Sequence, residues 1–257
     1  MRFKRRSAAI IALAVAGALS VAGIALAATS STVSFKFTPG KVSKTTPKAG
    51  QINVHTHTNY ADTSTNYTNR AQLYFDSDFA FNTGAVPKCN KTSISGTKTM
   101  AQAMAACGSK LIGKGTATAA AGANTVQACV LAFNGTGSGN GHVLLFTRAN
   151  VAPPFTMNCA NPTSNTAGNT NVLLDGQLGP ANKPGYGKLL DFNNIHAASA
   201  LPLTDFNVTI GKPTVPATGN YVAAKCSHSP KTWKVQTKFT YDSGSPQTVN
   251  STQACTN

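Results

Sequence analysis

QLYFDSDFAFN, residues 72–82, alternates between apolar and polar side chains over its length, with one interruption at Ser77. Successive side chains of a β-strand point to opposite faces of a sheet, so this period of two is typical of a half-buried strand. We expect the core face to carry Leu73, Phe75, Phe79 and Phe81. We expect the solvent face to carry Tyr74, Asp76 and Asp78. The stretch therefore predicts a sheet with one buried face.

The same signal recurs along most of the chain, with turn-forming residues between the runs. We predict strands at 32–37, 51–59, 113–119, 125–133, 142–148, 171–178, 188–193, 203–210, 221–226, 232–241 and 247–255. One helix is predicted at Met100–Cys107, where good helix formers are followed by Gly108. Many short strands with few helices indicate a mostly β fold, an antiparallel two-sheet β-sandwich or jelly-roll-like domain over residues 28–257.

Residues 1–27 read as an export signal. A basic segment, Met1–Arg6, precedes an uncharged apolar run that closes on Ala25-Leu26-Ala27, the small-x-small pattern that signal peptidases cut. We therefore predict a secreted, extracellular protein of the cell envelope. The apolar run is long enough to span a bilayer if it is left uncut, so membrane contact is expected only through this segment.

Six cysteines form an even set, which an exported protein is expected to pair into three disulfides. They are Cys89, Cys107, Cys129, Cys159, Cys226 and Cys255. Six cysteines allow fifteen pairings, and spacing alone does not choose among them. The simplest hypothesis joins nearest neighbours, 89 with 107, 129 with 159 and 226 with 255. No Cys-x-x-Cys or Cys/His spacing suggests a zinc or redox centre.

The chain is strongly basic, with 22 lysines and arginines against 7 acidic residues, all of them aspartate. Cleavage after Ala27 would remove four of the 22, and of the 18 that remain only Arg70 and Arg148 are arginines. A surface that reads nucleic acid is expected to be richer in arginine, so nucleic-acid binding is not expected. The charge favours an anionic cell-wall polymer or a glycan as the partner.

Two sets of side chains could contact such a partner: lysines in the Lys/Thr/Pro-rich loop at 38–50, and tyrosines near the first hairpin. They are Lys41, Lys44 and Lys48, and Tyr60, Tyr67 and Tyr74. The plainer interpretation is that the lysines are solvated and that the tyrosines are scattered over the surface.

A metal site is the alternative. His55 and His57 are two apart on one predicted strand, and Asp76 and Asp78 are two apart on another, so each pair projects from one face. If these strands were antiparallel neighbours, two imidazoles and two carboxylates would converge into a donor set that can hold zinc. The plainer interpretation is that they are ordinary polar residues on solvent-facing strands. The sequence has no nucleophile motif of a hydrolase, and no cofactor is expected.

The chain contains AVPKC at 85–89, TMAQAMAACG at 99–108, ACVLAFNG at 128–135, VLLFTRAN at 143–150 and LTDFNVTI at 203–210. In these segments it resembles a family of uncharacterised secreted actinobacterial proteins. The resemblance covers most of the mature chain and implies export, but the family has no known activity and assigns no site residue. We therefore expect a non-catalytic binding or structural module that engages anionic or glycan components of the cell envelope. A metal-dependent hydrolase that uses the His-x-His and Asp-x-Asp pairs is the alternative.

Overall fold

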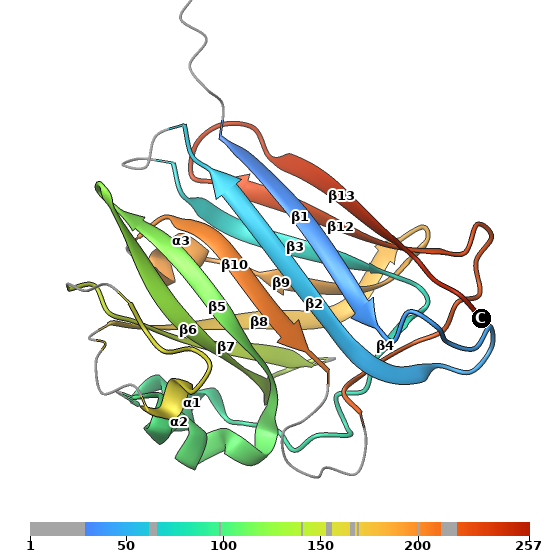
Figure 1. The fold of residues 1–257 in the computed structure, drawn as a ribbon, viewed down its shortest axis with the longest axis horizontal. Coiled ribbons are helices and arrows are strands. Elements are labelled where there is room, and N and C mark those ends of the chain that lie inside the picture. The colour runs from blue at the N-terminus through green and yellow to red at the C-terminus, as the bar shows by residue number, and fades with distance from the viewer. Residues whose placement is uncertain are drawn as a thin grey trace, which may run out of the picture.

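The computed structural model describes residues 29–61, 66–97, 99–139, 141–152, 156–164, 168, 170–199, 201–211 and 220–257. The export signal predicted at 1–27 lies outside these residues. The described part is mostly antiparallel β-sheet, which confirms the predicted fold class (Figure 1). The strands are β1 (Ser30–Thr38), β2 (Lys48–Asn59), β3 (Thr68–Asp76), β4 (Phe79–Phe81), β5 (Leu111–Ala121), β6 (Asn124–Gly135), β7 (His142–Ala149), β8 (Thr170–Lys183), β9 (Tyr186–Phe192), β10 (Leu203–Ile210), β11 (Val222–Ala224), β12 (Thr232–Tyr241) and β13 (Gln247–Ala254). The α-helices are α1 (Lys91–Ser95), α2 (Met100–Cys107) and α3 (Ile195–Ala198).

The described strands form one sheet in the order β13-β12-β3-β9-β8-β7-β6-β5-β10-β2-β11-β4, with β1 paired to β2. The sheet curls so that β1 and β13 lie side by side (Figure 1). The N–H groups of Ser31 and Phe37 donate to the side-chain oxygens of Gln247 and Gln253, each at 2.6 Å. Each glutamine amide also donates back to the carbonyl of the same β1 residue. Two side-chain amides thus replace a backbone ladder between these edges.

The curled sheet makes two layers with the main core between them. In Figure 1, β1, β2 and β10 lie in front of β3, β9 and β8. Apolar side chains from both layers fill the interior, including Ile52 of β2, Phe75 of β3 and Trp233 of β12. This layered arrangement is compatible with the predicted sandwich, although its two layers belong to one continuous sheet.

A second core lies on the outer face of the same sheet. From Ala128 to Gly135 both faces of β6 are buried, and its outer face packs with β7 against α1 and α2. The Thr99 hydroxyl begins α2 by accepting the N–H of Gln102 at 3.1 Å, and Gly108 follows its last residue. Met100 is fully buried in this second core, so α2 packs on the sheet, and the predicted helix is confirmed.

All three disulfides join nearest neighbours in the chain, as the simplest hypothesis proposed: Cys89–Cys107, Cys129–Cys159 and Cys226–Cys255. The first two lie in the second core and hold α2 and the segment around Cys159 to the sheet. Three disulfides in one chain indicate an oxidising environment. None of the helices in the described part of the chain is both long and apolar enough to cross a membrane.

The prediction for residues 72–82 is wrong in two respects. The stretch is divided into β3 and β4 by a turn at Ser77, and Asp76 and Asp78 are 1% and 3% exposed rather than solvent-facing. Asp76 accepts the N–H of Asp78 at 2.9 Å, which closes the turn. Alternation of apolar and polar residues continues across a tight turn, so the pattern alone does not reveal it. Burial of the two carboxylates is tolerated because backbone donors surround them.

Candidate functional site

The four residues of the predicted metal site lie in two separate places. β2 pairs with β1, β10 and β11, whereas β3 pairs with β9 and β12, so the strand adjacency that the prediction requires is not found in the described residues. His55 Nε2 lies 2.8 Å and His57 Nδ1 3.4 Å from Asp205 Oδ2 on β10. These three side chains are partly exposed on the outer face of the sheet, where such pairs contribute little to stability.

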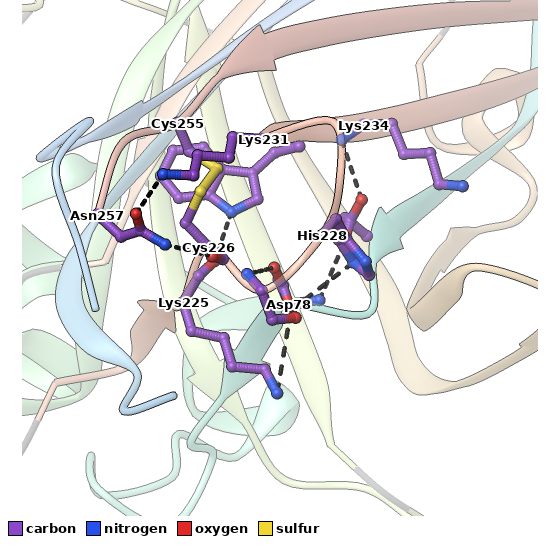
Figure 2. The surroundings of a disulfide bond; sticks show 11 residues. Asp78, Lys225, Cys226, His228, Lys231, Lys234, Cys255 and Asn257 are labelled. Carbon is purple, nitrogen blue, oxygen red and sulfur yellow. Dashed lines mark hydrogen bonds and ion pairs between the residues drawn. A yellow bond between two sulfur atoms is a disulfide. The ribbon is translucent and has the colours of Figure 1, made fainter. Parts of the chain in front are cut away.

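Asp76 and Asp78 lie at the turn between β3 and β4, and both bond to the loop between β11 and β12. Figure 2 shows Asp78 beside this loop. His228 Nε2 donates to Asp76 Oδ1 at 2.7 Å, and the Ser227 N–H donates to Asp78 Oδ2 at 2.6 Å. Asp76 also accepts a hydrogen bond from the backbone N–H of Lys234 at 3.3 Å, and Asp78 accepts one from the Ser227 hydroxyl. Both carboxylates therefore accept hydrogen bonds from the loop between β11 and β12, and Asp76 also accepts one from β12.

This cluster is better explained as a structural link between the β3–β4 turn and the β11–β12 loop than as a metal or catalytic centre. Ligand atoms of Asp76, Asp78 and His228 lie within 4.8 Å of one another, a spacing that a metal ion could use. The carboxylate oxygens of Asp76 and Asp78, however, already accept hydrogen bonds from N–H and O–H groups of the protein. Ser77 Oγ lies 3.3 Å from His228 Nε2, the nitrogen that also meets Asp76. A Ser-His-Asp triad needs serine and aspartate on different ring nitrogens, so this arrangement does not make one.

Two of the three tyrosines expected to contact the partner are engaged in other contacts. The Tyr60 hydroxyl donates to the Leu203 carbonyl at 2.9 Å, and burial raises the pKa of its phenol. Tyr67 packs on the imidazole of His196, with 4.2 Å between ring centroids. The Tyr60 hydroxyl and the Tyr67 ring are therefore engaged with other groups of the protein.

Tyr74 lies in a different group, the Tyr74–Tyr186 patch, which consists of Tyr74, Tyr186, Lys183 and Lys234 on the outer face of the sheet. The two rings meet edge to face at 6.0 Å. Lys183 Nζ lies 4.8 Å from the Tyr74 ring and Lys234 Nζ lies 4.9 Å from the Tyr186 ring. The three predicted loop lysines are all exposed: Lys41, Lys44 and Lys48.

A cavity of about 500 Å³, the main cavity, lies against the inner faces of β5, β6, β7 and β8. Its volume falls within the range of about 300–1,000 Å³ that is typical of small-molecule sites. The space exists because many inward positions of these strands carry a methyl group only. These are Ala117, Ala119, Ala121, Ala128 and Ala149. Among the described residues that line it none is ionisable, and its polar groups are hydroxyls of threonine and serine.

The main cavity adjoins a smaller space of about 80 Å³, the inner cavity, between the two layers of the sheet. Four apolar residues line both: Leu174, Ile195, Leu203 and Phe206. The inner cavity is otherwise lined by core side chains and includes the hydroxyl-bearing Tyr221 and Thr237. At the other end, lining residues such as Ala198 are exposed, so the main cavity reaches the surface there.

The short helix α3 covers the junction of the two cavities. Ile195 is buried and lines both of them, while the next residue, His196, points to Asp242 and Tyr67. Asn194, directly before the helix, adopts a left-handed conformation with φ 56°, which lets the chain leave β9 sharply. One face of α3 thus contacts the cavity, and the other is attached to the loop after β12.

Sequence reasoning missed these cavities. The run of small residues TATAAA at 116–121 was the available signal, because alanine at inward positions of a long strand leaves interior space unfilled. Comparisons of the chain with protein-family models, with curated proteins and with solved structures gave no match. The resemblance to secreted actinobacterial proteins therefore remains a prediction.

Proposed function

We propose that this protein is a secreted, non-catalytic binding protein of the cell envelope whose ligand is a neutral, largely apolar molecule of the lipid class, held in the main cavity. The observation that carries the proposal is the main cavity itself, about 500 Å³ in volume and lined by aliphatic side chains and a few hydroxyls. A concave, mostly apolar space of this volume that opens to the surface is the usual form of a small-molecule site.

The lining decides the chemistry of the ligand. Transfer of a methylene group from water into apolar surroundings is worth about 0.8 kcal/mol, so an aliphatic chain would gain affinity along its length. An ionised group would lose its hydration without a compensating charge, because the described lining of the main cavity offers none. A neutral chain is favoured for this reason over an anion.

The export signal and the three disulfides support an extracellular location. Outside the cell, lipids of the envelope are the abundant source of apolar chains. A module that keeps such a chain out of water needs no catalytic group, and the hydrogen-bonded Asp76 and Asp78 fit a structural role.

An anionic polymer or glycan of the envelope is a second candidate ligand, at a different surface. The Tyr74–Tyr186 patch favours it, because aromatic faces suit sugar rings and the two lysines attract negative charge. Retention on purified cell wall that weakens as salt is raised would support this candidate, since exposed charge contacts are screened. Retention that does not change with the salt concentration would contradict an electrostatic interaction between this patch and the cell wall.

Binding of an apolar fluorescent probe such as N-phenyl-naphthylamine tests the proposed function. Ala117→Leu and Ala128→Leu place extra methyl groups inside the main cavity, and we expect each to weaken probe binding about tenfold while the fold is kept. Ala101→Leu makes the same chemical change on the exposed surface of α2 and should leave binding unchanged. Equal binding by all four proteins would contradict the proposal.

A further inference from the structure

Two buried hydroxyl groups at the inner cavity have no hydrogen-bond partner. Tyr221 Oη and Thr237 Oγ1 belong to residues with 0% exposure, and neither atom has a partner within the part of the chain that the structure describes. Both residues line the inner cavity. Buried polar groups in folded proteins are nearly always paired, so each exception needs an explanation.

Two other buried hydroxyls at the inner cavity do have partners. Thr58 and Thr68 line the same cavity, and both are hydrogen-bonded, to the hydroxyls of Ser31 and Tyr60 respectively. The hydroxyls of Thr58 and Thr68 are therefore paired, whereas those of Tyr221 and Thr237 have no partner among the described residues.

From this arrangement we infer that the ligand is a neutral amphiphile that lies with its polar end in the inner cavity, where a hydroxyl or carbonyl oxygen bonds to Tyr221 and Thr237. The inference rests on the proposed function, since the apolar chain would occupy the main cavity. The two cavities adjoin each other, because four apolar residues line both of them.

The polar end must be uncharged. The described residues that line the inner cavity include no lysine, arginine or histidine that could neutralise a carboxylate or phosphate. Burial raises the pKa of the Tyr221 phenol far above its ordinary value, so the phenol keeps its proton and can donate it in a hydrogen bond. Alcohols, ketones and esters with a long chain fit this chemistry, and fatty-acid anions do not.

The test compares three ligands of equal chain length, a linear alcohol, the corresponding alkane and the corresponding fatty-acid anion, by displacement of the fluorescent probe. We expect the wild-type protein to bind the alcohol about tenfold more tightly than the alkane, because the alcohol supplies the missing hydrogen bonds. Tyr221→Phe and Thr237→Val remove one hydroxyl each at nearly constant volume, and each should reduce this preference. Tyr241→Phe is the matched control, because the Tyr241 hydroxyl bonds to Ser31 outside the cavity lining.

The outcomes separate this inference from the proposed function. If alkane and alcohol bind equally well, water rather than a ligand satisfies the two hydroxyls, and the inference is overturned while the proposed function stands. If the fatty-acid anion binds most tightly, the requirement for a neutral ligand is overturned. If none of the three displaces the probe and the probe itself does not bind, the proposed function fails. Folding of Tyr221→Phe and Thr237→Val is checked by circular dichroism, and an alcohol preference retained in both folded variants would also overturn the inference.

Discussion

His196 Nδ1 lies 2.5 Å from Asp242 Oδ2, and this contact attaches α3 to the loop after β12. The helix has only four residues, Ile195–Ala198, and its first residue lines both cavities. A helix this short has little stability of its own, so its position depends on such tertiary contacts. The His196–Asp242 pair is therefore one of the contacts that hold α3 over the junction of the two cavities.

Removal of this contact should make ligand exchange faster. In His196→Ala, α3 loses its attachment to Asp242, and we expect apolar probes to bind and leave several times faster in stopped-flow fluorescence. The cost in folding free energy should stay near 1 kcal/mol, as for a single partly exposed hydrogen bond. His57→Ala removes a similarly exposed histidine that lies away from the cavities and serves as the control. Identical exchange rates in both variants would argue against a covering role for α3.

The Asp76–His228 cluster should matter for stability rather than for binding. Asp76→Asn replaces one acceptor oxygen with an NH₂ group that faces N–H donors, so we expect a loss of about 1–3 kcal/mol in the free energy of unfolding, measured with urea. Asp205→Asn, at the exposed cluster on β10, should cost much less. If Asp76→Asn is as stable as the wild-type protein, the hydrogen bonds of Asp76 do not contribute to the free energy of unfolding.

Closure of the sheet by glutamines can be tested at Gln247 and Gln253. Replacement of either by leucine removes two hydrogen bonds to β1, and we expect a loss of about 1–2 kcal/mol for each. The amide protons of Ser31 and Phe37 should then exchange faster with solvent in the respective variants. Gln236→Leu, on the outer face of β12, is a control that leaves β1 untouched. Unchanged exchange at both amides would mean that the glutamines do not hold the two edges together.

The protein should lose stability at alkaline pH. Burial raises the pKa values of the Tyr60, Tyr221 and Tyr241 phenols in the folded state. Above about pH 10 the unfolded chain releases these protons while the folded protein retains them, so the free energy of unfolding falls as the pH rises further. Urea titrations between about pH 8 and about pH 12 measure this slope. In Tyr221→Phe the free energy of unfolding should fall less steeply with pH. The same slope as in the wild-type protein would contradict a raised pKa of the Tyr221 phenol.

Much of the sheet could be predicted from the sequence because each strand carries its own local pattern. The strands predicted at 203–210 and 232–241 coincide with β10 and β12, and all three disulfides join the predicted neighbours. The turn at Ser77 could not be predicted, because alternation continues through it and the burial of Asp76 depends on a loop about 150 residues away.

The candidate site was harder to predict for the same physical reason. The partner of His55 is Asp205, which lies on a strand that the chain reaches 150 residues later. The cavities depend on which strands face one another, and this is set by the curl of the sheet rather than by any single segment. Only the alanines of β5 hinted at an unfilled interior.

Intermolecular nuclear Overhauser effects give the most direct test of the central claim, that an apolar chain binds in the main cavity. With a linear long-chain alcohol bound to the methyl-labelled protein, we predict contacts from the chain methylenes to the methyl groups of Ala117 and Ala128, which line the main cavity, and none to Ala101 on the surface of α2. Contacts confined to surface methyl groups, with Ala117 and Ala128 silent, would contradict the account.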